Sequence, residues 1–397
     1  MNEASAHSPL WRSPFRPFFL LGTLYGVLLF SSWISLYSGW LAPGWLAQGN
    51  LPQLFHQHEM LFGFSSAIVF GFILTALPSW AGTAEAAGSR LQWLVLSWLA
   101  GRVAVASTTL LPLPVVAALD LSFPVLFGLL IGPGLRKVHY RFKLGLALII
   151  GGYFAGNLCY YLGVMEHDRG LWLQGLRLGL FSLIFHCSVT VGILAPIFTE
   201  NALRESGRPR SIGHNHLLEW LSALSLPALA IADTTGAPAA ASGGLALLSC
   251  LLHGLRLCRW HSLMIIASPI VWVLHFGYAW LVVALALYAG QAFGLPVGTE
   301  SWVHAFTIGG FGLMSLGLMT RVSLRHTGRK MRPAPAMVAG YLCLAVAALL
   351  RVVLPYTGAG HLLLILSALL WLIPYLIYLA LFSRILLAPS LNNQHSA

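Results

Sequence analysis

Long apolar runs fill this sequence, and they constrain its fold more than any other feature. Only 8% of the 397 residues are charged, whereas soluble domains carry roughly 25% charged residues. A soluble protein of this length could not cover its surface with so few charges. We therefore expect the lipid bilayer to be the solvent for most of the chain.

The apolar runs have the length of membrane-spanning helices, which need about 20 residues each. They are continuous, whereas the strands of a membrane barrel alternate apolar and polar residues. We predict an all-α membrane protein, a bundle of about 12 transmembrane helices in one polytopic domain over residues 1–397. The expected spans are 18–37, 56–80, 91–110, 114–133, 142–163, 171–198, 215–233, 240–258, 267–290, 299–323, 335–353 and 361–387.

The basic residues orient these spans. With the N-terminus inside, 18 of the 22 Lys and Arg residues fall on the inner side, and Arg169 alone falls on the outer side. An even number of spans with both termini cytoplasmic satisfies the positive-inside bias. This bias accounts for the net charge of +11. Because no basic stripe interleaves with exposed aromatic residues, we exclude nucleic-acid binding.

The second span opens at its outer end with His56, His58 and Glu59. Ionisable residues are rare in membrane spans and mark functional sites. Side chains two positions apart on one helix point about 200° away from each other. His56 and His58 can therefore share a metal only if the helix begins near His58. His304, at similar depth in the tenth span, is the expected third ligand, because three imidazoles suit copper, iron or zinc. The alternative for an interfacial histidine is that it snorkels to the surface.

Two further histidines, His186 and His275, lie deep in the sixth and ninth spans. Counting residues places both roughly 22 Å below the outer edge. Two imidazoles at matched depth on different helices suit a haem iron or a buried metal. The alternative is a neutral histidine bonded to a neighbour such as Tyr278 or Ser182.

Three arginines lie inside the spans, and each needs an anion because arginine is always charged. The expected partners are either outer carboxylates or haem propionates, so Arg102 and Arg177 are candidate cofactor-binding residues. The arginines are Arg102, Arg177 and Arg351, and the carboxylates are Glu59, Asp120, Asp168 and Glu300.

Glycines gather in the tenth span, at positions 309, 310, 312 and 317. Either a neighbouring helix or a flat cofactor could lie against such a face. The sequence shows no clear internal repeat, although repeats in membrane transporters are often too weak to see by inspection.

Five segments make the sequence resemble the NnrS family of polytopic membrane proteins, in which Asn is typical where this chain has Ser79. The segments are Leu10-Trp11-Arg12-Ser13-Pro14-Phe15-Arg16-Pro17-Phe18-Phe19, His56-Gln57-His58-Glu59-Met60-Leu61-Phe62-Gly63-Phe64, Leu74-Thr75-Ala76-Leu77-Pro78-Ser79-Trp80, Trp272-Val273-Leu274-His275-Phe276-Gly277-Tyr278-Ala279-Trp280-Leu281 and Met319-Thr320-Arg321-Val322-Ser323-Leu324-Arg325-His326-Thr327-Gly328-Arg329.

The resemblance implies a haem- and copper-containing protein of the bacterial inner membrane that serves the nitric oxide response, through tolerance of nitrosative stress or support of denitrification. The partner would be nitric oxide or a nitrosylated metal species, and the electron donor is not indicated. Glu59 and Tyr278 would support the metal ligands or handle protons. The span count and the histidines within helices are also similar to the haem–copper oxidase architecture.

Two other functions fit the same residues. A secondary transporter could use intramembrane His and Arg as a proton or anion pathway. A metal-delivery or assembly factor for a respiratory enzyme would look nearly the same in sequence as a metal-binding enzyme.

Overall fold

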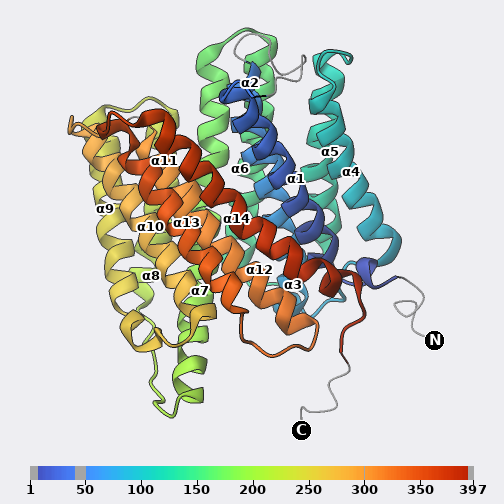
Figure 1. The fold of residues 1–397 in the computed structure, drawn as a ribbon, viewed down its shortest axis with the longest axis vertical. Coiled ribbons are helices and arrows are strands. Elements are labelled where there is room, and N and C mark those ends of the chain that lie inside the picture. Colours follow the sequence, from blue (N-terminus) through green and yellow to red (C-terminus); the bar gives the residue numbers. More distant parts are fainter. Residues whose placement is uncertain (1–7, 41–50, 299, 392–397) are drawn as a thin grey trace. The chain divides into compact units, whose positions relative to one another are not determined.

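A computed structural model describes residues 8–40, 51–298 and 300–391, and these residues form helices joined by short turns, with no strand among them. Figure 1 follows the helices along the chain from blue to red. Their contacts divide the chain into two compact units. Unit 1 comprises Met1–Ser182, Val322–Lys330 and Tyr378–Ala397, and unit 2 comprises Leu183–Arg321 and Met331–Ile377. Both units consist of apolar helices. The expectation that residues 1–397 form one polytopic domain stays a prediction.

Unit 1 contains the N-terminal helices. In it α1 packs against α3, and α4 lies beside α5, as Figure 1 also shows. The elements are η2 (Pro9–Trp11), α1 (Phe15–Tyr37), α2 (Leu51–His58), η3 (Glu59–Ser65), α3 (Ser66–Ala81), α4 (Gly88–Ala106), α5 (Leu113–Leu135), α6 (Tyr140–Met165) and the first turns of α7 (Arg169–Glu205).

Glycines allow α1 to approach the second span closely. A side chain at Gly22 would come within 2.9 Å of Ala67 Cβ, and one at Gly26 would overlap the ring of Phe64. Small residues of this kind let helix backbones pack directly in a membrane. The close pairing fixes the part of the second span that carries Glu59 against α1.

Unit 2 contains the rest of α7 and the C-terminal helices. In it α10 packs against α9 and η5, and Figure 1 shows α9 and α10 side by side. The elements are α8 (His216–Thr234), α9 (Ala239–Cys258), η4 (Ser262–Ile265), α10 (Pro269–Ala292), α11 (Ser301–His304), η5 (Ala305–Gly312), α12 (Leu313–His326), α13 (Pro335–Val353), η6 (Leu354–Tyr356) and α14 (Gly360–Leu387); the last turns of α12 and α14 belong to unit 1.

The predicted spans agree with the helices. Within the described residues, 11 helices are long and apolar enough to cross a membrane. The remaining expected span corresponds to α4, a helix of 19 residues that contains Arg102. The chain is therefore a multi-pass membrane protein. The cytoplasmic placement of both termini and the likeness to haem–copper oxidases stay predictions.

Candidate functional site

The second span does not begin as a regular α-helix. It passes from α2 into the π-helix η3 at Glu59. A π-helical turn holds an extra residue, and such turns occur frequently at functional sites. Glu59 is fully buried and His58 nearly so. The motif that the sequence singled out therefore lies inside unit 1.

Glu59 is held by one cation and one phenol. Nη1 of Arg102, from α4, donates to both carboxylate oxygens at 2.6 Å, and the hydroxyl of Tyr25, from α1, donates to Oε2. Nη2 of the same guanidinium donates to Asp120 of α5. Of the two partners expected for Arg102, carboxylate and haem propionate, the structure contains the carboxylate pairing.

His58 completes this cluster, and its hydrogen bonds indicate its charge. Its Nδ1 lies 2.7 Å from Glu59 Oε1, and its Nε2 lies 2.8 Å from Asn157 Oδ1. The amide of Asn157 is oriented by Asp120, which accepts from Nδ2 at 2.8 Å and from the Tyr161 hydroxyl at 3.0 Å. Both ring nitrogens thus face oxygen acceptors, the arrangement of an imidazolium. Two cations then balance two carboxylates.

This geometry bears on the expected outer metal site. Both nitrogens of His58 are engaged, so metal ligation would require release from Glu59 or Asn157. The condition under which His56 and His58 could share a metal, a helix that begins near His58, is not met, because α2 is helical from Leu51. Hence His56 points away from His58, and its ring stacks on Trp33 with centroids 4.2 Å apart.

His304, the third expected ligand, ends α11 in unit 2. Its Nδ1 lies 2.9 Å from the carbonyl oxygen of Glu300, one turn earlier, and the side chain is half-buried. A ring nitrogen that donates to a backbone carbonyl fixes the tautomer and leaves the lone pair on the other nitrogen, as in many metal-binding histidines. A metal shared by His56, His58 and His304 stays a prediction, since His304 belongs to the other unit.

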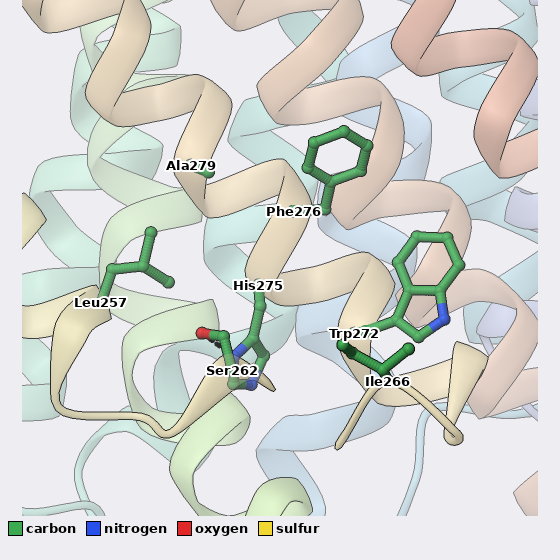
Figure 2. A pocket seen from close by; sticks show the side chains of 7 residues that line it. All are labelled: Leu257, Ser262, Ile266, Trp272, His275, Phe276 and Ala279. Carbon is green, nitrogen blue, oxygen red and sulfur yellow. Dashed lines mark hydrogen bonds between the residues drawn. The ribbon is translucent and has the colours of Figure 1, made fainter. Parts of the chain in front are cut away.

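His275 lies at the wall of a pocket in unit 2. Figure 2 shows its ring beside Ser262, with apolar side chains around them. The pocket has a volume of about 280 Å³. Its lining consists of Leu257, Ser262, Ile266, Trp272, His275, Phe276 and Ala279.

The hydrogen bonds of His275 define its tautomer. Its Nε2 lies 2.8 Å from the hydroxyl oxygen of Thr199, which itself donates to the carbonyl of Ala195. Thr199 therefore accepts from the Nε2–H group, and the Nδ1 lone pair faces the Ser262 hydroxyl at 2.9 Å. A rotation of the Ser262 side chain would leave this lone pair without its hydrogen bond.

The expectation that His186 and His275 lie at matched depth is wrong. His275 touches Thr199, which follows His186 by 13 residues on the same helix α7, a separation of roughly 20 Å along the axis. The count from sequence assumed that each span begins at the membrane edge. Because α7 has 37 residues, position 171 does not mark that edge. His186 is buried beside Thr190, 3.4 Å from its Nδ1, and a ligand role for each histidine separately stays a prediction.

Unit 2 also contains a buried polar cluster that the sequence analysis missed. Arg256 of α9 donates to Glu219 of α8, to the carbonyl of Ser188 at 3.0 Å and to the hydroxyl of Tyr278 at 3.1 Å. The same hydroxyl lies 2.9 Å from Nδ1 of His253. Trp260 connects this cluster to the pocket, because its ring packs on both His275 and Tyr278.

One polar atom of this second cluster lacks a partner. Within the part of the chain that the structure describes, Nε2 of His253 is buried and makes no hydrogen bond. A buried imidazole whose Nδ1 is held by a phenol and whose Nε2 is unpaired has the donor arrangement of a metal ligand. One signal for this cluster was present in the sequence, a histidine and an arginine three positions apart on one helical face.

The other two arginines inside the predicted spans, Arg351 and Arg177, lie in different surroundings. Arg351 of α13 lies 3.5 Å from Glu300, one of the carboxylates expected as its partner. Arg177 is exposed on α7, and its role as a cofactor-binding residue stays a prediction. In the described ranges no group of three or more His, Cys, Asp or Glu side chains is arranged to hold a metal ion.

The chain was also compared with known proteins. A family model described as NnrS protein matches residues 9–390, which is nearly the whole length. No curated protein matched the chain.

Proposed function

The chain belongs to the NnrS family, and on that premise we propose that it is a haem- and copper-containing protein of the bacterial inner membrane that binds or reduces nitric oxide, or acts on a nitrosylated metal species. Membership itself makes it a multi-pass membrane protein of the nitric oxide response. Beyond family membership, we propose the haem and copper cofactors, the bacterial inner membrane as the location, and binding or reduction of nitric oxide or action on a nitrosylated metal species.

His275 beside an apolar pocket is the observation that carries the haem proposal. An imidazole with an orientable lone pair, among aromatic and aliphatic side chains, is the donor set of a haem site. Thr199 would hold the ring by accepting from Nε2, and Nδ1 would bind the iron once the Ser262 hydroxyl moved away from it. A haem held there would supply an iron that binds nitric oxide.

Residues around the pocket would control access and protons. Trp272 and Phe276 line it and would exclude water from the bound ligand. Tyr278 lies one turn beyond His275 on α10 and is bonded to Arg256 and His253. This arrangement can hold a proton at the Tyr278 hydroxyl or at Nδ1 of His253, close to Trp260 and the pocket wall.

Copper is proposed at imidazoles outside this pocket. His304 and His56 are the candidates whose rings are half-buried rather than enclosed. His58 would join them only after release from its two hydrogen bonds.

An optical spectrum tests the haem proposal. Protein purified from a haem-replete host should show a Soret band that shifts on reduction and again on addition of nitric oxide, and metal analysis should find iron and copper. His275→Ala should lose or alter the band, whereas His214→Ala, which changes an exposed histidine, should not. A colourless, metal-free wild-type protein would refute the proposal.

A secondary transporter is the second candidate, and one observation favours it. The cluster of His58, Glu59, Arg102 and Asp120 buries two carboxylates with a titratable imidazole inside a membrane unit, and such groups commonly form proton pathways. Proteoliposomes should then show uptake driven by a proton gradient, with no haem spectrum. Glu59→Gln should abolish that uptake, and uptake that survives the change would exclude this pathway.

A further inference from the structure

The two units contain a similar pair of helices. In unit 1 the second helix begins its π-helical segment η3 directly after His58, and in unit 2 the segment η5 begins directly after His304. π-Helices are rare, so their occurrence at the same place after a histidine is unexpected. In both units the preceding helix, α1 or α10, packs against this segment.

Glycine contacts show that the two pairs share one register. When position 58 is matched with 304, position 63 falls on 309 and 71 on 317, and all four of these are glycines. A side chain on each would meet the partner helix at matching positions. The contact of Gly63 with Tyr25 corresponds to that of Gly309 with Trp280. In the same way, Gly71 with Phe18 corresponds to Gly317 with Val273, and Gly22 with Ile68 corresponds to Gly277 with Met314.

The first helices also match in sequence. Ser13-Pro14 precedes Gly22 by the same interval that separates Ser268-Pro269 from Gly277. Tyr25 and Trp280 follow these glycines at equal distance. We infer that α10 with η5 and α12 is a structural repeat of α1 with η3 and α3, although no repeat is evident from the sequence alone.

The repeat exposes one chemical difference. Position 59, the first residue of η3, is Glu59, and its counterpart in η5 is Ala305. In unit 1 the aromatic residue of the first helix, Tyr25, donates to the Glu59 carboxylate. In unit 2, among the residues that the structure describes, the indole Nε1–H of Trp280 is buried and has no hydrogen-bond partner.

The third helices of the two units each carry an arginine. In unit 1 the third helix, α4, supplies Arg102 to Glu59. In unit 2 the third helix, α13, supplies Arg351, which lies 3.5 Å from Glu300 at the start of α11.

The structure therefore assigns to unit 2 a site for a ligand carboxylate, which would take the place that the Glu59 carboxylate has in unit 1. Trp280 Nε1–H is its donor, and Ala305 carries no carboxylate of its own. A haem propionate and a fatty-acid carboxylate share this chemistry. The site does not depend on the proposed function, because it concerns recognition of the carboxylate and not the metal.

Ester pairs test the carboxylate directly. Purified protein is titrated with haemin and with its dimethyl ester, and with a fluorescent fatty acid and its methyl ester. A charge-assisted hydrogen bond predicts roughly ten- to a hundredfold tighter binding of at least one acid than of its ester. A preference within the haemin pair indicates propionate, and a preference within the fatty-acid pair indicates lipid. Equal affinities within both pairs would overturn the inference.

Variants identify the site. Trp280→Phe should remove most of the preference for the acid, whereas Trp93→Phe, at an exposed position on α4, should keep it. Ala305→Glu should compete with the ligand by restoring the unit 1 arrangement. If Ala305→Glu does not fold, Trp280→Phe decides alone, and an unchanged preference there overturns the site. A fatty-acid preference without haem binding supports this site and contradicts the proposed haem function.

Discussion

Replacing Arg102 by Met should strongly destabilise unit 1. The guanidinium is 4% exposed and contacts two carboxylates, Glu59 and Asp120, that are 0% and 2% exposed. Removing one partner from a buried ion pair costs about 3–5 kcal/mol, because it leaves uncompensated charge. Here Arg102→Met leaves two carboxylates against His58 alone, so the folded population should fall more than about a hundredfold relative to unfolded protein.

The assay is reversible unfolding in mixed detergent micelles, followed by circular dichroism. The informative comparison is Arg102→Met combined with Glu59→Gln, because that pair removes one charge of each sign and leaves Asp120 with His58. The double variant should be more stable than Arg102→Met alone, with a coupling free energy of about 1–3 kcal/mol. If the single variant unfolds like the wild type, or if the two changes simply add, the charge-balanced cluster is not what stabilises this unit.

Three further changes test packing and hydrogen bonding in the same unfolding assay. Gly192→Leu should destabilise unit 2, because the Arg256 guanidinium occupies the space a side chain would need, whereas Gly254→Ala, where the nearest atom would be 3.7 Å away, should be tolerated. Thr199→Val should lower the free energy of unfolding by about 1–3 kcal/mol, because it leaves the buried Nε2–H of His275 without an acceptor. An unchanged free energy of unfolding would contradict that hydrogen bond. Gly71→Ala and Gly317→Ala, the repeat counterparts, should destabilise by similar amounts, and a large effect at only one of them would contradict the shared register.

The helices could be predicted from sequence because the bilayer leaves the backbone few choices. A continuous apolar run must satisfy its own peptide groups, and a helix is the way to do so within one segment. For this reason even α4, which carries Arg102 and is less apolar than the others, was recognised as a span. The family was recognised for a different reason, since segments such as Trp272–Leu281 keep their residue identities and not merely their hydrophobicity.

The site could be predicted only in part, because residue counting fixes depth poorly. The pairing of Arg102 with Glu59 and Asp120 was among the expected alternatives, since an arginine in a membrane must meet an anion. The pairing of His186 with His275 failed because a 37-residue α7 is longer than the bilayer is thick. The π-helix at Glu59 was not predicted from the sequence, and its residues contact Tyr25 of α1 and Arg102 of α4, which lie far from it along the chain.

Arg256 shows why the second cluster was missed and what that implies. We expected this arginine at the inner end of the span 240–258, among the inner basic residues, where a charge needs no buried partner. The structure places it on α9, 5% exposed and bonded to Glu219. Each unit thus buries an arginine against a carboxylate from a neighbouring helix, with a histidine and a tyrosine attached. In unit 1 the histidine uses both nitrogens, whereas in unit 2, among the described residues, His253 has Nε2 unpaired. Of these two buried histidines, His253 is therefore the one that keeps a ring nitrogen without a hydrogen bond.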